Sequence, residues 1–158
     1  MTARGPVQVA NDFYTTLLHL NIKGLPTPNE ATAINPFLSS ELRDKFAGAK
    51  REQEKFIAEA KMKGETLKAP WSEGNHFGSN YEGMSSFSFG PPQISNETVS
   101  IPVYLVYQEG KNDKDPAQWI DILVLKQTNE GWKVYDLFFC APWDFGIRGN
   151  LRSIIPNH

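Results

Sequence analysis

The chain has 158 residues, 40% of them hydrophobic, so one domain over residues 1–158 with a sizeable core is expected. Its formal net charge of −2 and pI near 5.9 give no electrostatic basis for binding nucleic acid or an anionic membrane surface. A single cysteine excludes an intramolecular disulfide, and no run reaches the roughly eighteen apolar residues of a membrane helix, so no membrane insertion is expected.

The N-terminal half carries the periodicity of amphipathic helices. A first helix, ended by Lys23-Gly24, is predicted by apolar residues that recur about every four positions: Val9, Phe13, Leu17 and Leu20. A longer helix is predicted from about Ser40 to Lys63. Ser39 suits its N-cap, and Gly64 suits the position just after its end.

A loop rich in Gly, Pro, Ser and Asn follows, from Glu65 to Asn80. Three large aromatic side chains, Trp71, Phe77 and Tyr81, lie in it or directly after it. Aromatic side chains in a loop commonly plug the mouth of a cavity or cover the edge of a core. We therefore expect these three residues to shape the mouth of a binding cavity.

Four strands are expected in the C-terminal half, over about 81–89, 98–108, 119–128 and 132–139. The last two form a hairpin, whose loop is predicted to be Asn129-Glu130-Gly131 with Gly131 in the left-handed conformation. This loop would pair Thr128 with Trp132, Leu125 with Tyr135 and Asp121 with Phe139.

Both faces of this hairpin are apolar, which indicates that something covers each of them. Asp121 and Tyr135 are expected on one face, and Val134 and Asp136 on the other. A short helix is expected near residues 150–155. The order of elements predicts an α+β domain, in which N-terminal helices pack on one face of a curved antiparallel sheet of about four strands.

Several short motifs occur in a fixed order along residues 7–155. They are Asn11-Asp12-Phe13-Tyr14, Pro36-Phe37-Leu38-Ser39 with Glu41-Leu42, Tyr81-Glu82-Gly83, Trp119-Ile120-Asp121, and Gly131-Trp132-Lys133-Val134 with Asp136. In this order they resemble the nuclear transport factor 2-like superfamily, whose members have a cone-shaped, cystatin-like fold. The closer resemblance is to an uncharacterised bacterial branch of often secreted or lipid-anchored proteins. It implies a fold and an envelope location, and no mechanism.

Asp121 is the residue that most suggests chemistry. A carboxylate on an apolar face is costly unless it is paired, hydrogen-bonded or protonated. In the isomerases of the superfamily that the chain resembles, a protonated carboxylic acid on a cone-lining strand stabilises an enolate oxygen. An enzyme of this type would use Asp121 with helpers drawn from Tyr104, Tyr107, Tyr135 and His76. The spacing of these residues selects no pair, and Tyr135 and His76 are taken as the candidates. The favoured interpretation is that Asp121 is structural and meets a basic residue or a backbone donor.

No metal site and no cofactor are expected. The three histidines lie far apart, without the spacing of metal ligands, and no glycine-rich phosphate loop precedes a helix. Cys140 has no catalytic partner motif and is expected to be a small buried thiol. Asp136 is expected to be a structural partner for a residue of a helix.

Two classes of function remain. The favoured class is a non-catalytic binding module that holds a partner protein or a small molecule, with candidate contacts at Trp71, Phe77, Tyr81, Tyr104, Trp119 and Asp121. Its most concrete version is an immunity-type protein that neutralises a cognate toxin, and a homodimer through the sheet face is also considered. The alternative is a small enzyme of isomerase, cyclase or dehydratase type.

The resemblance also bears on where the protein acts. The resemblance implies a periplasmic or envelope-associated protein. Residues 1–5 lack an apolar segment, so we expect such a protein in a mature form without its signal peptide. A cytoplasmic protein is the alternative.

Overall fold

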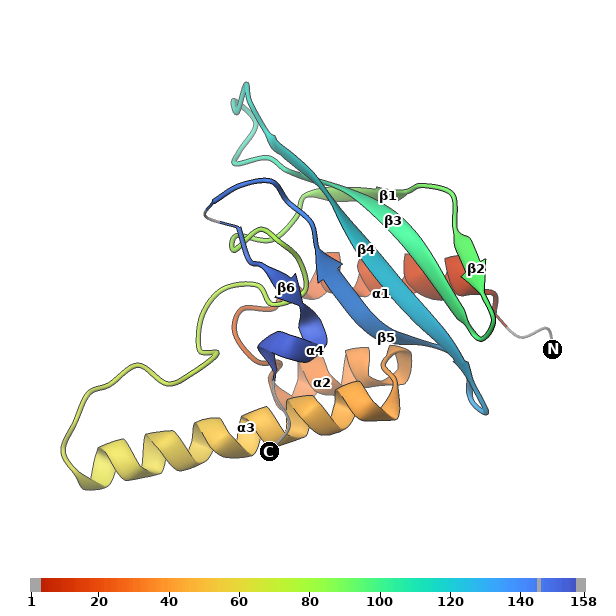
Figure 1. Cartoon of the computed structure of the whole chain (residues 1–158). Coiled ribbons are helices and arrows are strands. Elements are labelled where there is room, and N and C mark those ends of the chain that lie inside the picture. The colour runs from red at the N-terminus through yellow and green to blue at the C-terminus, as the bar shows by residue number, and fades with distance from the viewer. Residues whose placement is uncertain (1–3, 145, 156–158) are drawn as a thin grey trace.

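The computed structural model describes residues 4–144 and 146–155 and has an α+β fold, with helices packed on an antiparallel sheet (Figure 1). The first half holds α1 (Pro6–Leu20), α2 (Pro28–Ile34), the 3-10 helix η1 (Asn35–Phe37) and α3 (Ser40–Met62). The second half holds β1 (Ser86–Phe89), β2 (Gln93–Ser95), β3 (Thr98–Tyr107), β4 (Ala117–Thr128), β5 (Gly131–Phe139), β6 (Gly149–Asn150) and α4 (Leu151–Ile154).

The helices begin and end where local chemistry favours it. Pro6 occupies the first turn of α1, where its missing N–H costs nothing, and Asn21 ends the helix in the left-handed conformation. The side chain of Ser39 accepts a hydrogen bond from the Leu42 N–H and so caps α3, as expected. Gly64 follows this helix with φ +69°, a value that glycine adopts without strain.

The sheet is antiparallel throughout, with strand order β1-β3-β4-β5-β6. The four expected strands correspond to β1, β3, β4 and β5. Two short strands join them: β2, which also pairs with β3, and β6, which pairs with the end of β5. In Figure 1, α1 passes behind the strands and α3 runs along below them.

The core lies between the helices and one face of the sheet, called the inner face below. Alternate residues of the strands point into it, including Ile101, Val103, Leu123 and Leu125. Helices α1 and α3 and the loop before β1 contribute an aromatic group. Phe13 packs edge-on against both Tyr14 and the loop residue Phe77, while Phe46 stacks on Phe77 with ring centres 5.4 Å apart. Leu123, Leu125, Val134 and Leu137 of the hairpin are fully buried.

The hairpin between β4 and β5 differs from the prediction at its turn. Thr128 pairs with Gly131, so the loop is the two-residue Asn129-Glu130 and the pairing of Thr128 with Trp132 is wrong. A bulge then inserts Tyr135, because Leu125 faces Val134 while Val124 faces Asp136. The extra residue restores the predicted pairing of Asp121 with Phe139.

The bulge also changes which residues of β5 share a face. Val134 is buried on the inner face and forms a bridge with Leu38, whereas the Tyr135 ring lies under the side chains of Lys126 and Arg152. The predicted faces of Val134 and Tyr135 are therefore both wrong. The predicted separation of the two carboxylates is correct, because Asp121 lies on the inner face and Asp136 on the other.

Candidate functional site

Asp121 lies in the middle of the inner face and is fully buried. Its Oδ2 atom accepts hydrogen bonds from the backbone N–H of Ser79 at 3.0 Å and from the indole N–H of Trp119 at 3.0 Å. Its Oδ1 atom accepts hydrogen bonds from the Ser79 hydroxyl and from the Cys140 N–H, the latter at 3.1 Å. Four donors thus converge on one carboxylate.

Ser79 is the residue that ties distant segments to this carboxylate. Its hydroxyl oxygen accepts from the Ala141 N–H at 3.2 Å while its own proton goes to Asp121. Its backbone carbonyl accepts from the Ile147 N–H at 2.9 Å. The loop before β1, the strand β4 and the segment after β5 are therefore joined at one point.

This geometry favours a structural role for Asp121. A carboxylate has about four lone-pair sites, and here each oxygen already receives two donors. All four donors come from the folded chain itself, so none is held in reserve for a substrate. A buried carboxylate with this many donors anchors the loop to the sheet. Two of the donors are backbone N–H groups, as expected for a structural Asp121.

The helpers proposed for an enzyme do not reach this carboxylate. Tyr135 lies on the bulge beneath Arg152, whose guanidinium is 4.1 Å from the ring centre. The Nε2 atom of His76 is buried and has no hydrogen-bond partner among the described residues. Burial lowers the pKa of His76, an effect opposed by a hydrogen bond with the Trp71 backbone. The structure therefore does not bring Asp121, Tyr135 and His76 together.

Tyr14 ends the Asn11-Asp12-Phe13-Tyr14 motif and is fully buried, but the sequence did not indicate it as a site residue. Its hydroxyl has no partner among the described residues, and its ring lies against Phe13, Phe87 and Phe89. Burial first, and the charge of Asp121 second, raise the pKa of Tyr14 well above its usual value. The phenol is therefore neutral at ordinary pH.

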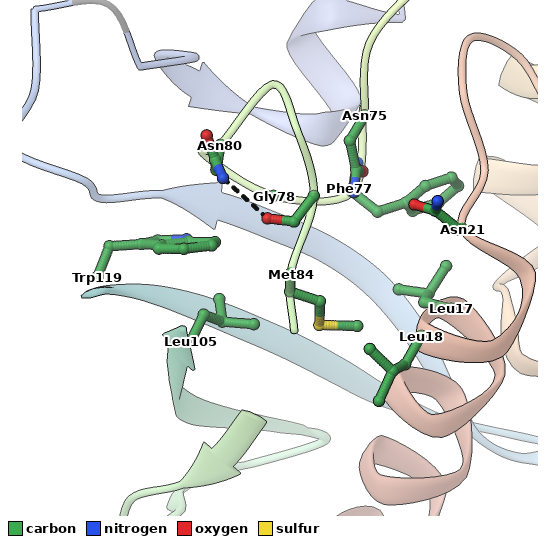
Figure 2. A pocket seen from close by; sticks show the side chains of 11 residues that line it. Leu17, Leu18, Asn21, Asn75, Phe77, Gly78, Asn80, Met84, Leu105 and Trp119 are labelled. Atoms are coloured by element: carbon green, nitrogen blue, oxygen red, sulfur yellow. Dashed lines mark hydrogen bonds between the residues drawn. The ribbon is translucent and has the colours of Figure 1, made fainter. Parts of the chain in front are cut away.

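The hollow at the open end of the inner face is very small. Figure 2 shows it between Leu17 and Leu18 of α1, the loop residues Phe77 and Met84, and Trp119 of β4. Its volume is about 20 Å³, which is the space of about one water molecule. Among the described residues, this hollow between α1 and the sheet is too small for an organic ligand.

The loop aromatics take three different positions. Phe77 is buried in the core cluster between Phe13 and Phe46, and it also lines the small hollow of Figure 2. Trp71 is half-buried and donates its indole N–H to the Ile154 carbonyl at 3.0 Å. Tyr81 is exposed and donates its hydroxyl to Glu73 at 3.1 Å. A large side chain fits either a core or a mouth, and composition alone does not separate the two.

The opposite, outer face of the sheet carries Tyr104, which the sequence grouped with the inner residues Trp119 and Asp121. Tyr104 is 41% exposed, its cross-strand neighbour Ile120 is 44% exposed, and Phe138 is 43% exposed. They belong to an apolar group, called the outer-face patch below, made of Pro102, Tyr104, Val106, Ile120, Ile122, Val124 and Phe138.

Two other predicted residues have clear positions. The Asp136 carboxylate accepts from the Asn150 side chain at 2.7 Å and from the Arg152 N–H at 3.2 Å, which confirms its expected role as a partner for a helix residue. Cys140 is exposed, so the expected burial of its thiol is wrong. Its backbone N–H donates a hydrogen bond to the buried Asp121. Partial burial and the nearby Asp121 charge raise the pKa of this thiol, which lowers its reactivity.

Ser79 and Tyr14 are the residues that sequence reasoning missed. Ser79 lies 42 positions before the carboxylate that it binds, and a serine in a Gly-Ser-Asn loop carries no signal of such a partner.

Among residues 4–144 and 146–155, no group of three or more His, Cys, Asp or Glu side chains is placed to hold a metal ion. No helix in the same ranges is long and apolar enough to span a bilayer.

Comparison of the chain with protein-family models, with curated proteins and with solved structures finds no match.

Proposed function

We propose that this chain is a non-catalytic binding module that recognises a partner protein through the outer-face patch. The observation that carries the proposal is a contiguous apolar surface on strands whose other face forms the core. Cross-strand pairs Tyr104–Ile120, Pro102–Ile122 and Ile122–Phe138 place the side chains of this patch next to each other. Apolar patches of this kind on a folded protein mark interaction sites.

The chemistry of the patch fits a protein partner. It contains two aromatic anchors, Tyr104 and Phe138, and aromatic side chains contribute much of the binding energy at protein interfaces. None of its seven side chains is charged, which is typical of the central part of an interface. A shallow hollow lies beside Tyr104 and Ile120, and a side chain of the partner can fit into it.

The enzyme alternative lacks comparable support. An isomerase or cyclase needs a cavity that holds its substrate next to the acid, and the inner hollow of about 20 Å³ holds about one water. Asp121 is already occupied by four donors. Both observations favour binding over catalysis.

The finer form of the proposal follows the resemblance described above. We infer a nuclear transport factor 2-like cone, which the order of helices and strands and the packing of α1 on the inner face support. On this basis the most concrete function is that of an immunity-type protein, located in the bacterial envelope, that neutralises a cognate toxin. Survival of cells that express a neighbouring toxin gene together with this chain would test that form.

The test of the patch itself is a pair of matched substitutions. Ile120→Lys places a charge inside the patch, whereas Ile94→Lys places the same charge on β2, where Ile94 is 78% exposed and outside the patch. A purified partner should lose about thirtyfold or more in affinity for the first variant, a penalty of roughly 2 kcal/mol. The second variant should bind like the wild type.

Light scattering distinguishes a foreign partner from a second copy of the chain. If Ile120→Lys converts a dimer into a monomer, the patch is a homodimer interface. Equal partner binding by both variants, together with an unchanged oligomeric state, would contradict the proposal.

A further inference from the structure

A groove between α2 and α3 lies apart from both Asp121 and the outer-face patch. Its apolar lining includes Leu25, Ala31, Ile34, Phe46 and Ala47. Its volume is about 180 Å³. An engineered apolar cavity of roughly 150 Å³ is large enough to take up benzene. The groove therefore has room for an apolar body of about six carbon atoms.

One stripe of α3 gives the groove its charge pattern. Arg43, Phe46, Ala47 and Lys50 follow the spacing i, i+3, i+4 and i+7, which places them on one face of the helix. The two cations lie two turns apart, about 10 Å along the helix axis, with the apolar pair between them. No Asp or Glu is among the described residues that line the groove.

No ion pair among the described residues neutralises the two cations of this stripe. Arg43 is half-buried, and its guanidinium makes no hydrogen bond or ion pair with any residue in the described ranges. Lys50 has one long contact, in which its Nζ donates to Gln53 Oε1 at 3.4 Å. A guanidinium with five unused donors is well matched to the two oxygens of a carboxylate.

The walls of the groove are held in place without a ligand. Thr27 and Glu30 form a reciprocal capping box at the start of α2. The connector before this helix is fixed by the hydrogen bonds from Gly24 N to Gly74 O at 2.7 Å and from Leu25 N to Trp71 O at 3.0 Å. The small side chains of Ala31 and Ala47 leave the space between the helices open, so the groove is preorganised.

We propose that the α2–α3 groove binds an aliphatic monocarboxylate, such as a free fatty acid. The alkyl chain lies between the two helices against Ile34 and Phe46, and the carboxylate lies at the guanidinium of Arg43. Lys50, at the other end of the stripe, adds a weaker attraction because Gln53 already occupies one of its donors. This site is independent of the outer-face patch and of any partner protein bound there.

Calorimetric titration of the purified chain with butanoate, pentanoate, hexanoate and decanoate tests the assignment. The dissociation constant should fall about fourfold for each added methylene until the groove is full. Decanol, which has no charge, should bind at least tenfold more weakly than decanoate. The same loss is expected for decanoate with Arg43→Gln. Lys55→Gln removes an exposed cation of the same helix outside the groove and should change the constant less than twofold.

A second variant tests the place of the alkyl chain. Ala47→Phe fills the groove from an exposed helix position and should abolish decanoate binding while the thermal unfolding temperature stays close to that of the wild type. The proposal is overturned if decanoate shows no saturable binding at millimolar concentration. It is equally overturned if Arg43→Gln and Lys55→Gln bind decanoate alike, since any binding would then be unrelated to the groove.

Discussion

Replacing Asp121 by asparagine is the sharpest perturbation of the buried network. The substitution keeps the shape of the side chain and turns one acceptor oxygen into an NH2 group. If that group takes the place of Oδ2, it meets the Ser79 N–H and the Trp119 indole N–H, which are both donors. If it takes the place of Oδ1, it meets the Cys140 N–H and a serine hydroxyl that already accepts from Ala141.

Either orientation leaves at least one buried donor facing another donor. A buried polar group without its partner costs about 1–3 kcal/mol, and the loss of hydrogen bonds to a charged acceptor adds about 1.5–3 kcal/mol. We therefore expect Asp121→Asn to lower the free energy of unfolding by about 3–5 kcal/mol. For a chain of this length, the melting temperature should fall by about 10 °C or more.

Thermal unfolding followed by circular dichroism measures this effect. Asp115→Asn is the matched control, because Asp115 is exposed and its carboxylate makes no hydrogen bond or ion pair within the described ranges. Its effect should stay within about 0.5 kcal/mol. If Asp121→Asn melts within about 2 °C of the wild type, the carboxylate does not hold the loop to the sheet and the structural assignment is wrong.

Three further substitutions follow from the structure, and each can be measured by chemical or thermal unfolding. Ser79→Ala removes one donor to Asp121 and the acceptor of the Ala141 N–H, so it should destabilise by about 2 kcal/mol, whereas the exposed Ser86→Ala should be neutral. Tyr14→Phe should be neutral or stabilising by up to about 1 kcal/mol at pH 7, because it removes a hydroxyl without a partner; a loss above that would show that the hydroxyl is bonded. The wild type should also lose stability above about pH 10, where the unfolded phenol ionises while burial keeps the pKa of Tyr14 in the fold higher, and Tyr14→Phe should lose less. Gly24→Ala should destabilise by about 1–3 kcal/mol, since φ at Gly24 is +77° and the new Cβ would lie 2.9 Å from the carbonyl oxygens of Trp71 and Ser72. Gly48→Ala in α3 is its control: the new Cβ meets only the Arg51 guanidinium at 3.6 Å, so the change should be neutral or stabilising.

The helices were predictable because their signals are local. An apolar stripe, a serine cap and a following glycine lie within a few residues of the helix that they define, so α1 and α3 begin and end near the expected positions. The fold class followed from the same signals, together with the alternation of residues along β3 and β4.

The details of the hairpin were not predictable, because they depend on distant segments. Asn-Glu-Gly fits both a three-residue loop and a two-residue loop followed by a paired glycine. The two-residue loop alone would turn the residues after Tyr135 to the wrong face of the sheet. The bulge at Tyr135 shifts the register by one residue and corrects this. Val134 is held inward through its bridge with Leu38, which the sequence separates from it by almost a hundred positions.

The candidate site shows the same limit. That Asp121 needs donors follows from its apolar neighbours in the strand, and this expectation favoured a structural role. Which donors reach it depends on how the loop before β1 and the segment after β5 fold back onto the sheet. Ser79 is therefore visible only in three dimensions.

The most direct measurement of the central proposal is site-specific photocrosslinking in cells of the native source. A photoreactive phenylalanine analogue at Tyr104 or Phe138 lies in the outer-face patch, and the same analogue at Met62 lies on the exposed end of α3 as the control. The proposal predicts one covalent adduct of defined mass that forms from both patch positions and is absent from position 62. Adducts that form equally at position 62, or no adduct at either patch position, would contradict the assignment of the outer face as the binding surface.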